Sequence, residues 1–339
     1  MGYFTKRTAE AWLRNTLDDA RRGVLPEMVM SGATFADAAA EWLRYIEHDR
    51  RRKPSTVAGY QIMVRSHLLP RFGDIPIESI KSQAIEDWLS SMTQASSTRR
   101  QALVLMNGIF RRARKVWGLQ SNPVTEVEKP PIERSGDLQV YSPEEVWALV
   151  RAAATDQDGA LFLTAAFTGL RMGELIALRW RDIDFRASAV RVCASYYAGH
   201  LTTPKSGKVR AVPMAPDVAS ALARLGQRKH WTGDDDLVFV GDTGRYLDGS
   251  ALRRRYKGAL RRGGLRQLRF HDLRHTFGTR MIGIADVRRV QEWMGHADIQ
   301  TTMRYLHFAP RAEDAQLVAR AFRVSTALPG SEGMGVPAA

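Results

Sequence analysis

Apolar residues recur at three- and four-residue spacing in the first third of the chain, which is the spacing of one face of an α-helix. Phe35, Ala39 and Trp42 are examples of this stripe. The pattern predicts helices within residues 35–52, 55–73, 82–94 and 97–118. Residues 34–118 are therefore expected to form a small all-helical domain.

A proline-containing stretch, residues 119–140, follows this helical pattern. Pro123, Pro130 and Pro131 each have a fixed φ angle and no N–H, which favours an extended connection over a helix. We interpret the stretch as a linker between two domains, with a surface loop inside one domain as the alternative.

The pattern after the linker opens with a clear helix start. Ser142 can cap the helix, Pro143 suits its first position, and Glu145 completes an S-x-x-E capping box. Helical spacing continues to about residue 180, and helices are expected again from residue 217.

Strands are expected between and after these helices. AVRVCASYY at 189–197 is rich in β-branched and aromatic residues, and LVFV at 237–240 is a short apolar run. Ser206-Gly207 lies between extended flanks, which predicts a β-hairpin. Residues 141–310 thus form a mixed domain, and the predicted fold class is mainly α with a small antiparallel β-sheet (α+β).

The two ends of the chain are expected to be peripheral. The pattern of residues 1–33 predicts a helical extension before the first domain. Residues 311–339 begin with an amphipathic stretch that predicts a short helix and end in a Gly-, Pro- and Ser-rich tail, which is typical of disorder.

Charge adds a class of partner. The 339 residues carry a formal net charge of +14, of which +6 lies within residues 34–118 and +9 within residues 141–310. This surplus indicates a polyanionic partner. A membrane is the weaker interpretation, because no uninterrupted apolar run approaches the ~20 residues that cross a bilayer and the N-terminus has no apolar secretory core. We expect a cytoplasmic protein with a polyanionic partner.

Cys193 is the single cysteine, which excludes an intramolecular disulfide and any multi-cysteine zinc site. It lies in an apolar string and is expected to be a buried core thiol. Basic side chains near predicted helix ends and the turn are candidate phosphate contacts, with a solvated surface as the alternative. These candidates are Lys53, Arg99, Arg100, Lys208 and Arg210.

Four separated segments of the second block carry polar groups suited to one phosphate. They are TGLRMGEL with Arg171, TPKSGK with Lys205, HDLRHTF with His271 and Arg274, and WMGHADIQTTMRYLH with His296 and Tyr305. In a helix, His271, Arg274 and His275 would share one face, as would Arg171 and Glu174. Spacing alone cannot bring the four segments together.

The last segment has a readable local geometry. Gly295 can end one helix, so the next can start near Asp298 and place Tyr305 about two turns in. His296 would then lie before the positive N-terminus of that second helix.

These motifs, in this order, resemble the tyrosine recombinase family, the phage-type integrases, over about residues 34–310. The resemblance implies a helical core DNA-binding domain and a catalytic domain that clamp duplex DNA between them. It also implies strand breakage and rejoining without metal or other cofactor, and a homotetramer on double-stranded attachment sites. Accessory DNA-bending or directionality factors are further candidate partners.

The resemblance also implies roles for the matched residues. Arg171 and Arg274 would hold phosphate oxygens, Tyr305 would attack to give a 3′-phosphotyrosine, and Glu174 would brace Arg171. Lys205 would protonate the departing 5′ oxygen, His271 would help to move the tyrosine proton, and His296 would donate a hydrogen bond to the phosphate.

Alternatives remain at this point. A lone tyrosine in a helix is usually a packing residue, and Lys205 could be one of several basic side chains that merely touch phosphates. A type IB-like topoisomerase would use the same chemistry, and a non-catalytic DNA-binding protein could keep the scaffold. Residues 1–33 resemble at most the last helix of an arm-binding domain.

Overall fold

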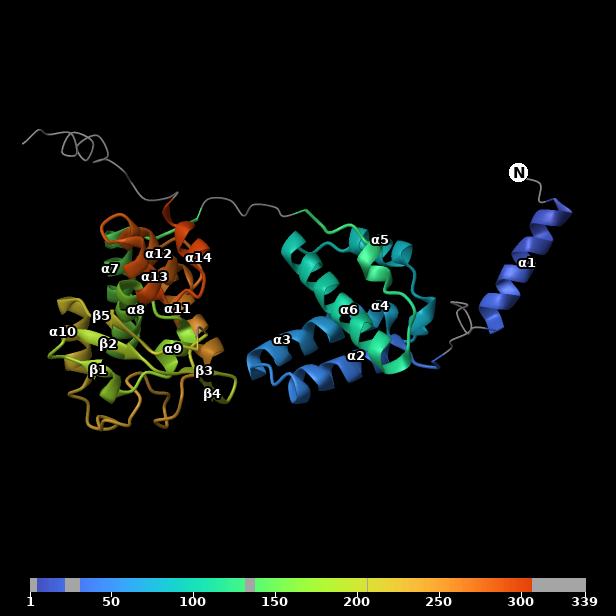
Figure 1. Ribbon diagram of the computed structural model, residues 1–339. Helices are drawn as coiled ribbons and strands as arrows, with labels where there is room; N and C mark the ends of the chain where they lie inside the picture. Colours follow the sequence, from blue (N-terminus) through green and yellow to red (C-terminus); the bar gives the residue numbers. More distant parts are fainter. Residues whose placement is uncertain (1–4, 22–30, 132–137, 206, 307–339) are drawn as a thin grey trace, which may run out of the picture. The chain divides into compact units, whose positions relative to one another are not determined.

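The computed structural model describes residues 5–21, 31–131, 138–205 and 207–306. The chain divides into two compact units, one of residues 1–137 with 197–200 and one of residues 138–196 with 201–339. The expected C-terminal helix and tail lie outside the described residues. Helices dominate both units (Figure 1), and the strands lie in the second, except that the β3–β4 turn with its two flanking strand residues is grouped with the first. The predicted fold class is therefore confirmed.

The first unit consists of helices and short helical turns. Its α-helices are α1 (Lys6–Arg21), α2 (Phe35–Arg44), α3 (Pro54–Met63), α4 (Leu69–Phe72), α5 (Ser82–Ser91) and α6 (Ser96–Trp117). π-helical turns at Tyr45–Asp49 and Val64–Leu68 follow α2 and α3, and 3-10 turns lie at Ile77–Ser79 and Pro123–Glu126. Pro70 lies two residues after the second π-helical turn and has no N–H to donate to the carbonyl four residues earlier.

Aromatic rings form the centre of this first core. Phe35 contacts Phe72 and Phe110 with ring centroids 5.9 and 6.1 Å apart, and Phe72 meets the edge of Trp88 at 5.3 Å. Thr34 and Asp37 form a capping box that begins α2 and so places Phe35 in the core. The helices predicted for residues 35–118 are confirmed.

The predicted linker does not begin at residue 119. Leu119, Val124 and Val127 are buried in the core of the first unit. Pro123 opens a 3-10 turn that Asn122 caps, so proline here starts a helical turn instead of an extended connection. The apolar side chains of this stretch outweigh the tendency of proline toward an open linker.

The second unit combines helices and two small sheets. Its helices are α7 (Pro143–Arg151), α8 (Asp156–Thr168), α9 (Met172–Ile176), a 3-10 turn (Trp180–Asp182), α10 (Pro216–Leu225), α11 (Gly249–Arg262), α12 (Asp272–Ile282), α13 (Val287–Met294) and α14 (Ile299–Met303). The strands are β1 (Ile183–Asp184), β2 (Ala189–Val192), β3 (Ser195–Tyr197), β4 (His200–Thr202) and β5 (Arg210–Pro213).

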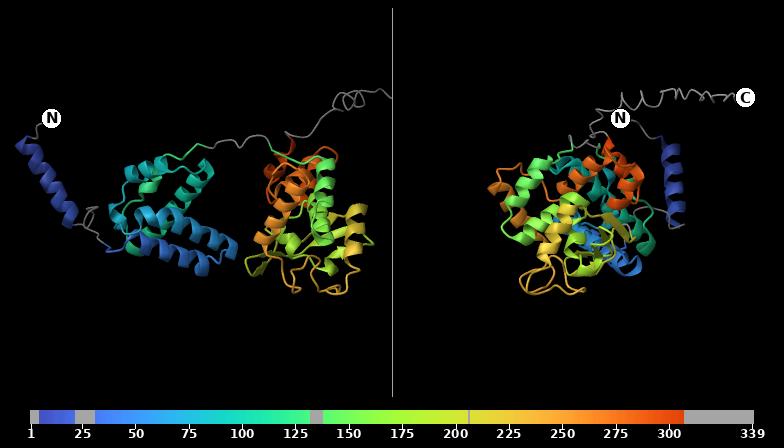
Figure 2. Two further views of the ribbon diagram at one scale, coloured as in Figure 1. Left: turned by 180° about the vertical axis from the view of Figure 1, so that it is seen from behind. Right: turned by 90° about the vertical axis from the view of Figure 1, so that its left-hand side faces the viewer.

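Helix α8 is the centre of this unit. It packs against α7, α10 and α12, and nearly all of its side chains from Asp158 onward are buried. In the left view of Figure 2, the green helices α7 and α8 lie between yellow α10 and the orange and red helices α12 to α14. The predicted capping box of Ser142 and Glu145 begins α7, with Pro143 at its first turn.

The strands pair differently from the expected hairpin. Strands β1, β2 and β5 form one antiparallel sheet with Val190 opposite Val212, and β3 pairs with β4 in a second sheet. Gly207 donates to the carbonyl of Pro204, so a turn is present, but β4 and β5 on either side of it belong to different sheets. The hairpin turn lies instead at Ala198-Gly199, where both φ angles are positive.

Two further expectations are corrected. Leu237 and Val240 form isolated β-bridges and the two residues between them bend, so LVFV is a buried segment and not a regular strand. Cys193 is half-buried because it lies between β2 and β3, outside the alternating buried positions of β2. Burial and neighbouring Asp182 raise the pKa of the Cys193 thiol, which disfavours a nucleophilic thiolate.

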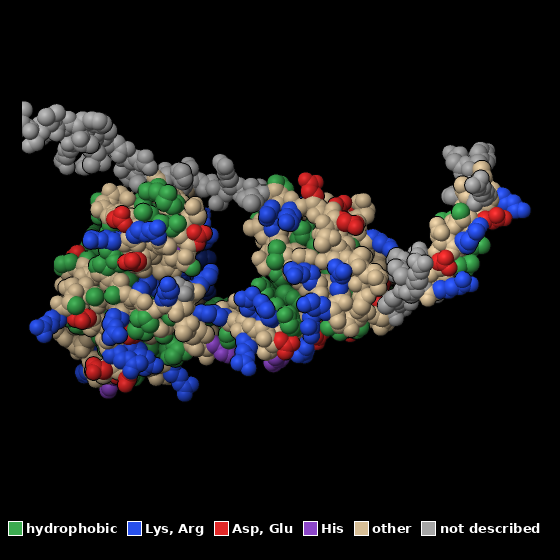
Figure 3. Space-filling view, in the orientation of Figure 1, with side chains coloured by type: hydrophobic (Ala, Val, Ile, Leu, Met, Phe, Trp, Pro, Cys, Tyr) green, Lys and Arg blue, Asp and Glu red, His purple; other side chains and the backbone are tan. Residues whose placement is uncertain are grey.

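Basic side chains are spread over the visible faces of both units (Figure 3). None of the helices in the described ranges is long and apolar enough to cross a membrane.

Candidate active site

Helix α12 carries the most deeply buried cation of the site. Arg274 is 2% exposed, and its guanidinium donates hydrogen bonds to the backbone carbonyls of Gly169 and Met294. Burial, followed by the charge of Arg171, lowers the pKa of Arg274 to about 9. The group therefore still carries its charge at neutral pH.

Arg171 is placed by the first turn of α9. Its N–H donates to Glu174 Oε2 at 2.8 Å, and its Nη1 lies 3.1 Å from Glu174 Oε1. Its Nη2 donates to the carbonyl of Gly295 at 3.3 Å, while a fifth of the side chain stays exposed. Glu174 thus contacts both the backbone N–H and the guanidinium of Arg171.

Three arginines meet at the C-terminal end of α13. Arg210 Nε donates to the carbonyl of Trp293 at 2.8 Å, and Arg274 and Arg171 donate to the next two carbonyls. A helix C-terminus carries unpaired carbonyls and partial negative charge, so it holds cations favourably. The chain then turns at Gly295 with φ +61°, as predicted. One helix end thus gathers groups from three distant segments.

Arg210 is a member of this internal network. It forms a two-pronged ion pair with Glu174, with N–O distances of 3.0 and 2.7 Å, and only 8% of its side chain is exposed. Burial raises the pKa of Glu174, but Arg210 and Arg171 outweigh it and hold that pKa below its ordinary value. The expectation that Arg210 contacts DNA phosphate gives way to a positioning role, because its N–H groups are engaged inside the protein.

Tyr305 lies two residues beyond the end of α14 and is 3% exposed. Its N–H bonds to the carbonyl of Thr302, so the helix is shorter than expected and Tyr305 follows it in a turn. A Cβ on Gly278 would lie 2.8 Å from Tyr305 Cζ, so only glycine lets the ring pack this closely on α12. Burial raises the pKa of the Tyr305 phenol, although nearby arginines oppose the shift.

His296 stacks nearly parallel to the Tyr305 ring, with centroids 6.2 Å apart. Its Nδ1 lies 2.8 Å from the hydroxyl oxygen of Thr302 on α14. Burial, followed by the charges of Arg274, Arg171 and Arg210, lowers the pKa of His296 to about 3. The imidazole is therefore neutral at physiological pH, and when Nδ1 accepts from Thr302 its ring proton lies on Nε2.

His271 lies at the start of α12, and Lys205 lies in the turn between β4 and β5. His271 begins α12 and keeps an exposed edge, and burial followed by the charges of His275, Arg274 and Arg171 lowers its pKa. Lys205 is exposed in its turn. Among the described residues, no hydrogen bond joins Lys205 to the Tyr305 hydroxyl, whose partner is His275.

The sequence interpretation missed His275 as a site residue. Its Nδ1 lies 2.9 Å from the Tyr305 hydroxyl, and its ring meets the edge of the His271 ring at 4.9 Å. The i, i+4 spacing of His271 and His275 was the available signal. The spacing of residues along the chain does not indicate which face of α12 Tyr305 contacts.

The remaining DNA-binding candidates lie on several elements. Lys53 begins α3, Arg99 and Arg100 lie in the first turns of α6, and Lys208 is exposed after the turn. Arg100 Nη1 donates to the carbonyl of Pro130, which fixes this side chain against the first unit.

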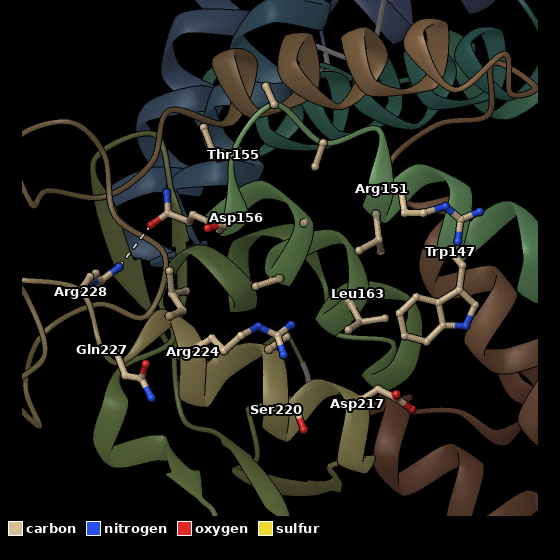
Figure 4. A pocket seen from close by; sticks show the side chains of 18 residues that line it. Trp147, Arg151, Thr155, Asp156, Leu163, Asp217, Ser220, Arg224, Gln227 and Arg228 are labelled. Atoms are coloured by element: carbon tan, nitrogen blue, oxygen red, sulfur yellow. Dashed lines mark hydrogen bonds between the residues drawn. The ribbon is translucent and has the colours of Figure 1, made fainter.

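A cavity lies elsewhere in the second unit. It has a volume of about 1090 Å³ and is lined by α7, α8 and α10, including Trp147 and Arg224 (Figure 4). Arg228 also lines the cavity, and its guanidinium donates hydrogen bonds to Gln157 and to the carbonyls of Leu237 and Val238. None of the predicted site residues lines this cavity.

In the described ranges no three His, Cys, Asp or Glu side chains gather in a manner that could hold a metal ion. The arrangement instead places two arginines, three histidines and a tyrosine around one small region. Such a set can bind an anionic phosphate, attack it with a phenol and move protons.

Comparison with protein families agrees with this chemistry. Residues 139–311 match the model of the phage integrase family, and residues 34–93 match that of the phage integrase N-terminal SAM-like domain. The tyrosine recombinase XerC of Corynebacterium glutamicum is 30% identical over 82% of this chain and 91% of its own. The integrase of Mycobacterium phage D29 is 26% identical over 94% of this chain and 88% of its own.

A solved structure shares the fold. A lambda integrase tetramer bound to a Holliday junction is similar with a TM-score of 0.64 at 17% identity, over 88% of this chain and 89% of that one. The family models, the C. glutamicum relative and the common fold agree: the chain belongs to the phage integrase family of tyrosine recombinases.

Proposed function

We propose that this protein is a site-specific recombinase of a mobile element, which cleaves and rejoins DNA through a 3′-phosphotyrosyl intermediate. The convergence of Arg171, Arg274 and Tyr305 around the C-terminal end of α13 is the observation that carries the proposal. The phage D29 integrase, a relative over nearly the whole chain, supports the mobile-element context.

The phosphate-binding part of the mechanism belongs to the arginines. Phosphodiester transfer builds negative charge on the non-bridging oxygens, and preorganised cations that face those oxygens stabilise the transition state. Arg171 and Arg274 are held by backbone carbonyls before DNA arrives, so little reorganisation is needed. Neutral His296 donates a third hydrogen bond to the phosphate from Nε2.

Covalent chemistry belongs to Tyr305. Its phenolic oxygen attacks phosphorus, the bond to the 5′ oxygen breaks, and the phosphotyrosine stores the bond energy for rejoining to another 5′-hydroxyl. Lys205 protonates the departing 5′ oxygen, and His271 assists proton movement at the phosphate. No nucleotide cofactor enters this cycle.

The assembly is proposed from the family and from charge. Residues 34–118 act as a core DNA-binding domain and residues 141–310 as the catalytic domain, and together they clamp a duplex attachment site. Four copies bring two sites together and exchange strands through a Holliday junction, as the lambda integrase tetramer is bound to one. Accessory DNA-bending or directionality factors set the direction of the reaction.

The test traps the covalent intermediate. Wild type and Tyr305→Phe are incubated with nicked duplexes cut from host and element DNA, so that the short 5′ fragment diffuses away after cleavage. Adducts that resist SDS, disappear with protease and form only with wild type are expected, and the trapped ends identify the site. Adducts in both proteins would move the nucleophile away from Tyr305.

Recombinant products complete the test. Two duplexes that carry the trapped sequence are expected to exchange strands with wild type. Relaxation of supercoiled DNA at many sites without recombinant products would instead indicate a topoisomerase. Bound duplex with no adduct would indicate a non-catalytic DNA-binding protein.

A further inference from the structure

The Tyr305 hydroxyl has a single hydrogen-bond partner among the described residues, which is Nδ1 of His275 at 2.9 Å. The two rings are tilted by 48° with centroids 5.8 Å apart. His275 follows Arg274 directly on α12, so the helix that presents the buried arginine also presents this imidazole.

The contact is held from several sides. The Tyr305 ring lies against Gly278 and near Met294, and His296 stacks on it. His296 is itself bonded to Thr302, three residues before Tyr305. The rings of Tyr305 and His296 are therefore constrained, and this directs the phenolic O–H of Tyr305 at the imidazole of His275.

We propose that His275 is the general base of DNA cleavage, which takes the proton from Tyr305 as its oxygen attacks the phosphate. The inference rests on the proposed phosphotyrosine chemistry and deepens it. It assigns the first proton transfer to His275, while His271 acts at the phosphate.

The step balances. The bond from Tyr305 Oη to phosphorus forms, the bond from phosphorus to O5′ breaks, and the proton passes from Oη to Nδ1 of His275. The departing 5′ oxygen takes a separate proton from the acid, for which Lys205 is proposed. In rejoining, the 5′-hydroxyl attacks, and the imidazolium of His275 returns its proton to the phenolic oxygen.

The surroundings keep His275 ready to accept a proton. The charged and titratable groups that face it are His271, Asp272 and Arg274 on α12, Arg269 before that helix, His296 after α13, and Arg304 and Tyr305 after α14. Burial comes first and, with the arginines, outweighs Asp272, so the pKa of His275 lies below its ordinary value. Nδ1 is then an acceptor at neutral pH when Nε2 carries the ring proton.

His271 is less well placed for this transfer. It makes no hydrogen bond to Tyr305 within the described residues, and its ring meets that of His275 edge to face. Its exposed edge at the start of α12 suits contact with bound DNA.

The test measures the pH dependence of cleavage in His275→Asn, whose side chain can hydrogen-bond but does not titrate. Single-turnover cleavage is followed from pH 7 to 9 on a nicked duplex that gives adducts with wild type. Wild type is expected to be nearly independent of pH here. The variant is expected to be about 100-fold slower at pH 7 and to gain about tenfold per pH unit, because hydroxide must then remove the phenolic proton.

His271→Asn is the matched control. It is expected to keep the flat pH profile of wild type, even if its rate falls. A slope that appears in His271→Asn and not in His275→Asn would overturn the proposal. The proposal would also be overturned if His275→Asn slowed cleavage by the same factor at every pH, since a uniform loss indicates a packing role alone.

A substrate with sulfur in place of the bridging 5′ oxygen separates base from acid, because a thiolate leaves without a proton. His275→Asn is expected to stay slow on this duplex. Recovery to the wild-type rate would make His275 the acid and would contradict the proposal.

A measurement without DNA distinguishes this inference from the proposed function. In ¹⁵N spectra of the uncomplexed protein, assigned with His275→Asn, the His275 ring is expected to carry its proton on Nε2, and its Nδ1 signal is expected to shift in Tyr305→Phe. A proton on Nδ1 in wild type would overturn the inference. Absence of adducts with wild type on bound duplex, despite the expected spectrum, would overturn the proposed function and its general-base step.

Discussion

Buried charge decides the architecture of the site at the scale of residues. Glu174 has no exposed side-chain surface, yet its carboxylate is ionised because Arg210 and Arg171 both contact it. A buried carboxylate remains ionised only while its ion pairs are intact, since an unpaired buried charge loses hydration without compensation. Arg210 thus supports Arg171 through Glu174 and needs no contact with DNA.

Removal of Arg210 is expected to be costly unless Glu174 is also neutralised. Arg210→Ala should lower the free energy of unfolding by about 3 kcal/mol, because Glu174 remains buried with one partner fewer. Arg210→Ala combined with Glu174→Gln should recover part of this loss, as measured by urea unfolding. Strictly additive losses in the double variant would contradict the coupling.

His296 predicts a pH dependence of stability. Its pKa is about 3 in the folded protein and about 6.5 when unfolded, so the unfolded state binds more protons as the pH falls below 6.5. Stability contributed by the neutral ring is therefore present above pH 6.5 and lost below it. Between pH 7.5 and 5.5, wild type should lose about 1 kcal/mol more free energy of unfolding than His296→Gln. Equal losses in denaturant titrations would refute this assignment.

Helices α12 and α13 organise the site at the scale of elements. Helix α13 offers its last carbonyls to three arginines, and α12 offers a surface without a side chain at Gly278 for the Tyr305 ring. Both features depend on helix ends and faces, so a small change in helix geometry alters the position of Tyr305.

Gly278→Ala should displace Tyr305 while the fold persists. The new Cβ would lie 2.8 Å from Tyr305 Cζ, well inside van der Waals contact. We expect adduct formation to fall at least about tenfold, since misplacement of a reacting group by 1 Å can cost about 100-fold. Gly59→Ala in α3 is the matched control, because nothing lies within 4 Å of its new Cβ. Equal cleavage by the two variants would contradict the role of Gly278.

Charge acts at the scale of the whole molecule. The surplus of +14 and the basic surfaces of both units favour a polyanion, and the chain belongs to a family of DNA recombinases. Each phosphate that a cation neutralises contributes about −0.9 to the slope of log affinity against log salt for duplex DNA.

Duplex binding should therefore weaken steeply as salt increases. Lys53→Ala and Lys208→Ala should each make the slope shallower by about 1 if each side chain contacts one phosphate. Fluorescence anisotropy with the trapped site over a salt series measures this. Arg210→Ala combined with Glu174→Gln should leave the slope unchanged, because Arg210 faces Glu174. A salt-independent affinity of wild type would refute binding through phosphates.

Local patterns in the sequence determined much of the molecule. Apolar spacing located the helices of residues 35–118, the capping box of Ser142 and Glu145 located the start of α7, and Gly295 located the end of α13. These features depend on neighbours within a few residues, which is why they can be read directly.

Tertiary structure decided what depended on distant partners. Strand pairing moved the hairpin to Ala198-Gly199, core packing absorbed Leu119 and Val124 from the expected linker, and the Glu174 carboxylate turned Arg210 inward. The contact of His275 with Tyr305 joins residues 30 apart in the chain. Sequence spacing determines which side chains share a helix face, but only the packing of helices determines what that face meets.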